Sequence, residues 1–167
     1  DRTGDWEGAV TEFRIALRLK PNYPPAHFNL GNALKRKGHI DDAVTEYRDA
    51  LRLNPNYPEA HDSIGTALHD RGNLHGAIAE YREALRLKPA YPEAHYDLGR
   101  ALRATGDLNG AIAEYQEALR LKPDYAEAHC NLGRVLEDEG EFREAVREFE
   151  KGHELGSKRP QWRYPSA

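Results

Sequence analysis

Histidines recur at a fixed interval of 34 residues, and they are the side chains of this chain best suited to chemistry. The four in the series are His27, His61, His95 and His129. Imidazole titrates near neutral pH and is the commonest metal-ligating side chain, so the series raises the question of a metal centre or an acid–base site. Either site requires ring nitrogens that converge on one point.

The elements that would carry these histidines keep them apart. Equivalent residues on neighbouring packed helices lie about 8 to 10 Å apart, whereas zinc ligands approach one ion to about 2.0 to 2.3 Å. His129 and Cys130 do not form a nucleophilic pair either, because adjacent helical residues point about 100° apart. We therefore interpret the histidines as packing residues, and we predict no metal, no cofactor and no catalytic residue.

The same interval governs the whole chain. Copies without gaps open at Pro24, Pro58, Pro92 and Ala126, and the runs HFNLGNAL, HDSIGTAL, HYDLGRAL and HCNLGRVL align. The predicted division is half a copy at 1–23, full copies at 24–57, 58–91 and 92–125, a degenerate copy at 126–156, and a cap or linker at 157–167. Because Asp1 begins within a copy, we expect the natural N-terminus to lie upstream.

The shared skeleton resembles the tetratricopeptide repeat family, whose 34-residue unit has Trp, Leu-Gly, Tyr, Ala, Phe and Pro at set spacings. The second full copy matches it at His61, Ile64, Gly65, Leu68, Ala77, Tyr81, Ala84 and Pro89. The longer runs look most like repeats of bacterial proteins and of O-linked N-acetylglucosamine transferases. The resemblance implies an all-α, right-handed α-solenoid, a superhelix of antiparallel helix pairs whose first helices line a concave side.

Local rules predict two helices in each copy. In PEAHYDLGRALRATG the apolar residues share one helical face, and Gly106 follows as a left-handed terminator. Asn56 with Glu59, and Asp124 with Glu127, have the spacing of a capping box. The second helices are predicted to begin near Asp5, Ile40, Leu74, Leu108 and Phe142, and to end before Pro21, Pro55, Pro89 and Pro123.

Small residues recur where the two helices of a copy must approach closely. They are Gly31, Gly65, Gly99 and Gly133 on the first helices, and Ala9, Ala43, Ala77, Ala111 and Ala145 on the second. A single hairpin cannot bury both of its faces, whereas stacked neighbours share one core. We therefore expect consecutive copies to pack side by side.

Composition excludes several classes of protein. The chain has 31% charged residues and a net charge of −4, and it has no run of the roughly 18 apolar residues that a membrane helix needs. No basic patch of the kind that binds nucleic acid is evident. One cysteine cannot form an intrachain disulfide, so no oxidising compartment is implied, and we expect a cytoplasmic protein.

Positions that differ between copies on the first helices are the candidate partner-binding residues. In order along the copies they are Phe28, Asn29, Asn32 and Lys35, then Asp62, Ser63, Thr66 and His69, then Tyr96, Asp97, Arg100 and Arg103, then Cys130, Asn131 and Arg134. Such a face can hydrogen-bond an extended peptide and hold an apolar side chain. An asparagine ladder of the transferase type is half present, at Asn29 and Asn131. A carboxylate clamp is disfavoured by acidic residues such as Asp97, so a partner of mixed or positive charge is expected.

The second helices carry a row of arginines, Arg18, Arg52, Arg86 and Arg120. We interpret them as solvated ion pairs, because Asp49, Glu83 and Glu117 precede three of them by three residues. At the chain ends, the face of Trp6, Val10, Phe13 and Leu17 lacks its first helix and is predicted to self-associate end to end. Trp162 and Tyr164 are expected either to cap the last helix or to begin a linker.

No enzyme signature is present, so the leading hypothesis is a non-enzymatic scaffold that binds a peptide or protein in the concave groove. One alternative is a partner-recruiting domain of a larger enzyme, such as a glycosyltransferase or a protein kinase. Another is a structural spacer that assembles end to end. The partner, the number of repeats in the parent protein, the compartment and the oligomeric state do not follow from the sequence.

Overall fold

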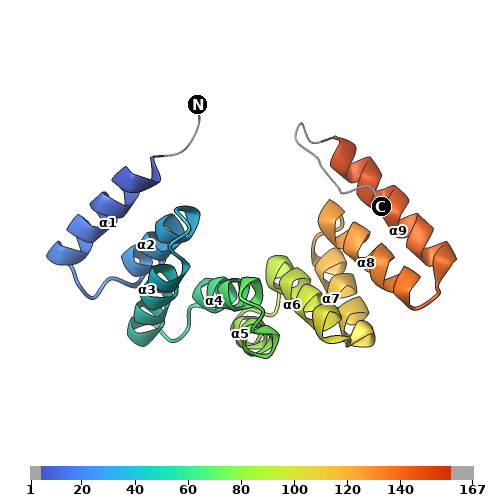
Figure 1. Ribbon diagram of the computed structural model, residues 1–167, viewed down its shortest axis with the longest axis horizontal. Coiled ribbons are helices and arrows are strands. Elements are labelled where there is room, and N and C mark those ends of the chain that lie inside the picture. The colour runs from blue at the N-terminus through green and yellow to red at the C-terminus, as the bar shows by residue number, and fades with distance from the viewer. Residues whose placement is uncertain (1–4, 159–167) are drawn as a thin grey trace. The chain divides into compact units, whose positions relative to one another are not determined.

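The computed structural model describes residues 5–158 of the 167-residue chain, and this part consists of helices without any strand (Figure 1). The helices are α1 (Trp6–Leu19), α2 (Pro24–Arg36), α3 (Ile40–Leu53), α4 (Pro58–Asp70), α5 (Leu74–Leu87), α6 (Pro92–Thr105), α7 (Leu108–Leu121), α8 (Ala126–Asp138) and α9 (Phe142–Ser157). The predicted all-α fold of helix pairs is confirmed. The expectations for Trp162 and Tyr164 lie outside the described residues.

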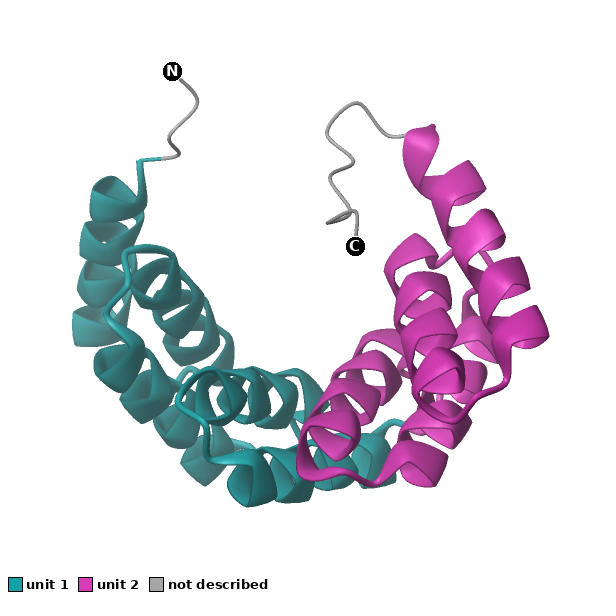
Figure 2. Cartoon of the chain, turned by 45° about the vertical axis from the view of Figure 1, so that its right-hand side comes forward, with its two compact units in different colours: residues 1–88 teal, residues 89–167 magenta. Residues whose placement is uncertain are grey.

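The chain divides into two compact units (Figure 2). Unit 1 comprises residues 1–88 and contains α1 to α5, and unit 2 comprises residues 89–167 and contains α6 to α9. The most extensive contacts lie within helix pairs, namely α2 with α3 and α4 with α5 in unit 1, and α6 with α7 and α8 with α9 in unit 2. Each of these pairs is the two-helix hairpin of one copy.

Proline and glycine residues mark several of the helix boundaries. Gly106 ends α6 with a φ of 86°, the left-handed conformation that the terminator prediction requires. Proline stands in the first turn of α2, α4 and α6, where its missing N–H leaves no helical hydrogen bond unmade. Second helices begin within one residue of their predicted starts.

The predicted capping boxes are wrong. The residues that flank the starts of α4 and α8 are Tyr57 and Tyr125, and neither makes a side-chain capping hydrogen bond. Asn56 and Asp124 lie one position too early to cap these helices. Side-chain caps occur instead at second helices, where Asp5, Asn73 and Asp107 accept hydrogen bonds from the backbone N–H groups of Gly8, Gly76 and Gly110.

The small-residue interpretation is confirmed by the packing of each hairpin. A Cβ atom built on Gly31 would lie 2.5 Å from Cε1 of Tyr47, and one on Gly99 would lie 2.8 Å from Cε1 of Tyr115. Both tyrosine rings are buried, and burial raises the pKa of Tyr47 to about 12. The glycines thus form the slots into which the aromatic rings of the second helices fit.

One expectation for the first helix is corrected. Val10 is buried, and it belongs to the core cluster of unit 1 together with Leu30 and Tyr47. Phe13 and Leu17 pack against the same cluster. The apolar face of α1 is therefore largely used by the following hairpin, and Val10 is not available to a second molecule.

Candidate functional site

Each histidine of the series forms a hydrogen bond or ion pair across its own hairpin. Nδ1 of the ring lies 2.6 to 2.7 Å from Oε2 of a glutamate that follows it by 19 residues on the second helix. The pairs are His27 with Glu46, His61 with Glu80, His95 with Glu114, and His129 with Glu148. The packing interpretation is therefore incomplete, because these rings also make a polar link.

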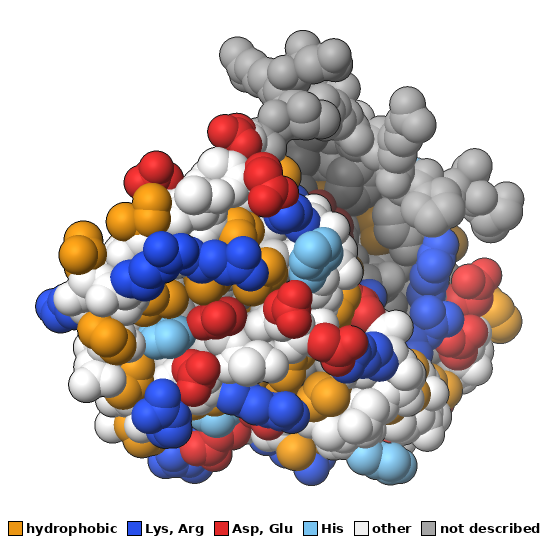
Figure 3. Space-filling model, turned by 60° about the vertical axis from the view of Figure 1, so that its left-hand side comes forward, with side chains coloured by type: hydrophobic (Ala, Val, Ile, Leu, Met, Phe, Trp, Pro, Cys, Tyr) orange, Lys and Arg blue, Asp and Glu red, His pale blue; other side chains and the backbone are white. Residues whose placement is uncertain are grey.

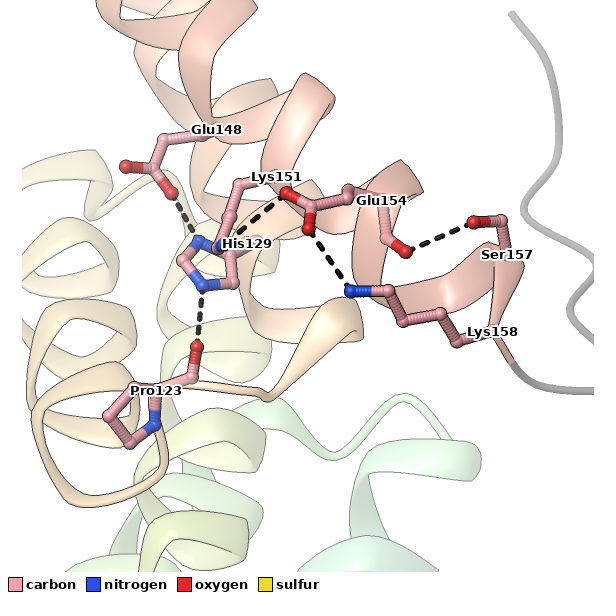
Figure 4. Close-up of polar contacts among 7 residues, drawn as sticks. All are labelled: Pro123, His129, Glu148, Lys151, Glu154, Ser157 and Lys158. Carbon is pink, nitrogen blue, oxygen red and sulfur yellow. Dashed lines mark hydrogen bonds and ion pairs between the residues drawn. The ribbon is translucent and has the colours of Figure 1, made fainter.

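In three copies the other ring nitrogen also faces an acceptor. Nε2 lies 3.0, 2.9 and 3.1 Å from the backbone carbonyl oxygens of Pro21, Pro89 and Pro123 in the preceding turn. Figure 4 shows this arrangement for His129, whose ring lies between Glu148 and Pro123. A carbonyl oxygen and a carboxylate both accept hydrogen bonds, so both contacts are satisfied when both nitrogens carry protons.

The pKa values of two of these rings agree with the geometry. Burial disfavours the charged form of His95, but the hydrogen bonds to Glu114 and to the carbonyl of Pro89 outweigh it and raise its pKa above the usual range. The pKa of His129 is raised for the same reasons, with Glu148 and Pro123 as partners. These two imidazoles act as structural links, and both nitrogens of each ring are already in hydrogen-bonding contacts.

One copy also places a third acidic group near its histidine. Atoms of His27, Glu46 and Asp49 lie within 4.8 Å of one another, which is the spacing of a metal-ligand set. The Nδ1 to Oε2 distance of 2.7 Å is that of a hydrogen bond, and Asp49 accepts from Arg52 at 3.1 Å. We therefore assign the cluster as a network of hydrogen bonds and ion pairs.

In unit 2 the structure brings four of the candidate groove residues together. The side-chain amide of Asn131 on α8 donates to the hydroxyl oxygen of Tyr96 on α6 at 2.8 Å. The Tyr96 ring also lies 4.9 Å from the ring of Tyr125. Arg100 lies over the Tyr96 ring at 5.9 Å and donates to Asp97 at 3.0 Å. Burial is the main cause that raises the pKa of Tyr96 to about 12.

Of two further candidates in unit 2, one joins consecutive first helices and the other is buried in the core. Arg103 on α6 forms an ion pair of 2.9 Å with Asp138 at the end of α8. Cys130 was expected on the binding face, but it is fully buried, and burial raises its thiol pKa to about 11. A Cβ atom built on Gly152 would lie 2.3 Å from its Sγ atom. The expectation for Cys130 is therefore wrong, because the missing side chain at Gly152 turns this thiol into a core residue.

In unit 1 the candidate residues have more varied roles. Phe28 packs its ring 4.9 Å from that of Tyr57, and Asn32 accepts a hydrogen bond from the hydroxyl of Tyr47 at 2.9 Å. Thr66 accepts one from Tyr81 at 3.4 Å. The remaining candidates of this unit, Asn29, Lys35, Asp62, Ser63 and His69, are exposed or half-buried.

Three of the four arginines in the second-helix row form ion pairs with acidic side chains. Arg52, Arg86 and Arg120 donate to Asp49, Glu83 and Glu117 at distances between 2.6 and 3.2 Å. Figure 3 shows a face of the molecule on which basic and acidic side chains are interspersed. The interpretation of the arginines as solvated ion pairs is confirmed for these three.

None of the helices in residues 5–158 is long and apolar enough to cross a membrane. The family model for the TPR repeat matches residues 2–38, 31–70, 65–106 and 99–140, and the tetratricopeptide repeat model matches residues 126–155. The chain belongs to the tetratricopeptide repeat family. Within that family pattern, the histidine series occupies the place of the first aromatic residue.

Solved structures of tetratricopeptide repeat proteins resemble the chain over most of its length. A crystal structure of MamA is 28% identical, with 93% of this chain and 91% of that chain covered and a TM-score of 0.83. MamA from Desulfovibrio magneticus RS-1 is 27% identical, with coverages of 96% and 90% and a TM-score of 0.83. YrrB is 22% identical, with coverages of 92% and 79% and a TM-score of 0.74. A search of curated proteins found no match.

Proposed function

We propose that this tetratricopeptide repeat chain is a non-enzymatic scaffold that binds an extended peptide segment of a partner protein on the exposed faces of its first helices. The observation that carries the proposal is the cluster of Tyr96, Asp97, Arg100 and Asn131 on α6 and α8. It combines an aromatic ring, an amide and charges of both signs on two neighbouring helices of one unit.

The chemistry of this cluster fits a peptide backbone. The Asn131 amide donates one of its hydrogens to Tyr96 and is half-buried, so its position is fixed before a partner arrives. An amide has two donor hydrogens and an acceptor oxygen, which match the acceptors and donors of an extended main chain. Fixing the side chain in advance lowers the entropy cost of binding.

Three side chains able to catalyse reactions are already used in the structure. His95 and His129 have both ring nitrogens in hydrogen bonds, and Cys130 is buried with a raised pKa. A general base needs a nitrogen within reach of substrate, and a nucleophilic cysteine needs an exposed thiolate. These facts support a binding role over a catalytic one.

One of the solved structures bears on the ligand class. YrrB is described as a TPR protein with an unusual peptide-binding site. We extend the peptide-binding role to the present chain, with a peptide or protein as partner and without nucleic acid, because Arg52, Arg86 and Arg120 of the second-helix row are paired with neighbouring acids.

A displayed library of random peptides tests the proposal. The full chain, an Arg100→Ala/Asn131→Ala variant and an Arg86→Ala/Arg120→Ala control are each used for selection. We expect the parent and the control to enrich the same sequence motif, and the groove variant to lose it. No enriched motif with the parent, or equal enrichment with the groove variant, would refute the proposed binding face.

A further inference from the structure

A hollow in unit 1 combines an aromatic ring with two cationic side chains. It is lined by Trp6 at the start of α1 and by Asn32, Lys35 and Arg36 on the last turns of α2. The indole is exposed, and the Arg36 guanidinium lies over it at 5.7 Å. One wall is thus aromatic, and the other carries two cations and an amide.

The two cations of this hollow have no acidic partner among residues 5–158. The neighbouring Lys37 pairs with Glu7, so that acid is already used. Asp70 follows Lys35 by 35 residues, the same separation that joins Arg103 to Asp138 in unit 2. Its carboxylate, however, lies 3.8 Å from Nδ1 of His69. Lys35 and Arg36 therefore keep their positive charges uncompensated by the described side chains.

The equivalent position in unit 2 shows what a neutralised arrangement looks like. Arg103 occupies the same position in the third full copy that Lys35 occupies in the first. It pairs with Asp138 at 2.9 Å. In that copy the residue after Arg103 is Ala104, so the second cation is missing as well. The pair of unneutralised cations is a local property of the first full copy and does not follow from the repeat pattern.

We propose that this hollow binds an acidic segment of the partner peptide, with two neighbouring carboxylates on Lys35 and Arg36 and an apolar side chain against Trp6. The inference rests on the proposed function and names the chemistry of one part of the ligand. Successive helical residues point about 100° apart, so the two head groups flank the hollow rather than meet at one point. That arrangement suits two acidic side chains better than a single C-terminal carboxylate.

The electrostatic reasoning favours the same ligand. Opposite charges across an interface raise the association rate and select against wrong partners. Guanidinium groups bind carboxylates in a planar fork, and an indole ring offers apolar area at little cost in conformational entropy. Asn32 adds an amide whose oxygen already accepts from Tyr47, which fixes its orientation.

Tryptophan fluorescence tests the proposal directly. The chain has two tryptophans, so a Trp162→Phe background leaves Trp6 as the reporter. The probe is a blocked pentapeptide of glycine, aspartate, glutamate, leucine and glycine, with a matched peptide in which asparagine and glutamine replace the acids. A third peptide has these neutral residues and a free C-terminal carboxylate.

We expect a saturable, salt-sensitive change in Trp6 emission with the acidic peptide alone. Charge reversal by Lys35→Glu/Arg36→Glu, or neutralisation by Lys35→Gln/Arg36→Gln, should weaken binding by about tenfold or more. The control Arg14→Glu/Arg18→Glu changes the net charge equally on α1 and should leave binding unchanged. Circular dichroism of each variant verifies that it is folded.

Three outcomes would overturn the inference. They are no binding of the acidic peptide, equal binding of the neutral peptide, and binding of the free-carboxylate peptide in place of the acidic one. The library selection with the Arg100→Ala/Asn131→Ala variant is independent of these measurements. A failure confined to the fluorescence experiment therefore removes the acidic subsite and leaves the proposed scaffold function standing.

Discussion

His129 lies 2.6 Å from Glu148 through Nδ1, and its Nε2 lies 3.1 Å from the carbonyl oxygen of Pro123. One imidazole thus joins α8, α9 and the turn that precedes α8. His95 makes the same two contacts with Glu114 and Pro89. Both contacts of such a link are made only while the ring is protonated, because a neutral imidazole has a single N–H group to donate.

Stability should therefore fall as the pH rises through the folded-state pKa of these two histidines. Their pKa values are raised on folding, above an unfolded value of about 6.5. In that window the folded chain binds more protons than the unfolded chain, so the free energy of unfolding decreases with increasing pH. The contribution is fully present below the unfolded value. Urea titrations between about pH 5.5 and 8.5 measure the slope.

Glutamine variants of the histidines provide the test and the control for the pH experiment. His95 faces Glu114 and Glu117 on α7, and His129 faces Glu148 and Lys151 on α9. A His95→Gln/His129→Gln variant should show a flatter pH dependence than the parent, because glutamine does not titrate. His75→Gln, at an exposed position on α5, serves as the matched control. A parent whose stability rises over this range would contradict the link.

The glycine slots should be intolerant of a single methyl group. In Gly99→Ala the new Cβ would lie 2.8 Å from Cε1 of the buried Tyr115 ring. Overpacking of this kind costs about 1 to 3 kcal/mol. The change is measured as the shift in free energy of unfolding in urea.

A double-mutant cycle separates this clash from the intrinsic effect of alanine. Leucine at position 115 removes the ring edge, so Gly99→Ala should destabilise a Tyr115→Leu background by less than it destabilises the parent. Alanine is the better helix former, so without the clash the substitution would stabilise α6. A stabilised Gly99→Ala variant in the parent chain would show that the ring moves aside freely.

The helices could be predicted from the sequence because their signals are local. Proline marks the first turn of α2, α4 and α6, and Gly106 ends α6 with a positive φ. The ion pair of Arg86 with Glu83 was predictable for the same reason, since both residues lie on one turn of one helix. Because the copies repeat every 34 residues, the helices predicted for one copy also predict those of the others.

Interactions between helices were less predictable. Each histidine of the series is followed 19 residues later by the glutamate with which it pairs. This recurrence is visible in the sequence, but it is overlooked when the histidine is interpreted only as a replacement for an aromatic packing residue. Cys130 occupies a position that varies between copies, and its burial depends on Gly152 in another helix. The capping boxes failed because the tyrosine before each first helix takes the capping position.

The Tyr96 to Asn131 hydrogen bond should contribute to the stability of unit 2. Tyr96→Phe keeps the ring and removes the hydroxyl group that accepts from Asn131 at 2.8 Å. Loss of one such bond costs about 0.5 to 1.5 kcal/mol. Asn131→Ala and the double variant complete a cycle, and the coupling is obtained from urea unfolding. Strictly additive effects of the two changes would show that the contact carries no energy.

The Cys130 thiol should react with a disulfide reagent only after the chain opens. Its side chain is fully buried, and burial raises its pKa to about 11, while the reactive form is the thiolate. The thiol reaction rate of the native chain in dilute buffer should therefore be far below that of the urea-unfolded chain.

Gly152→Ala would place a Cβ 2.3 Å from Sγ of Cys130, so it should accelerate the native reaction by favouring opening of α9. Gly140→Ala, at a turn with no neighbouring atom within 4 Å of the added Cβ, is the control for backbone strain alone. Equal rates for the native and unfolded parent would mean that Cys130 is accessible and that α9 does not cover it.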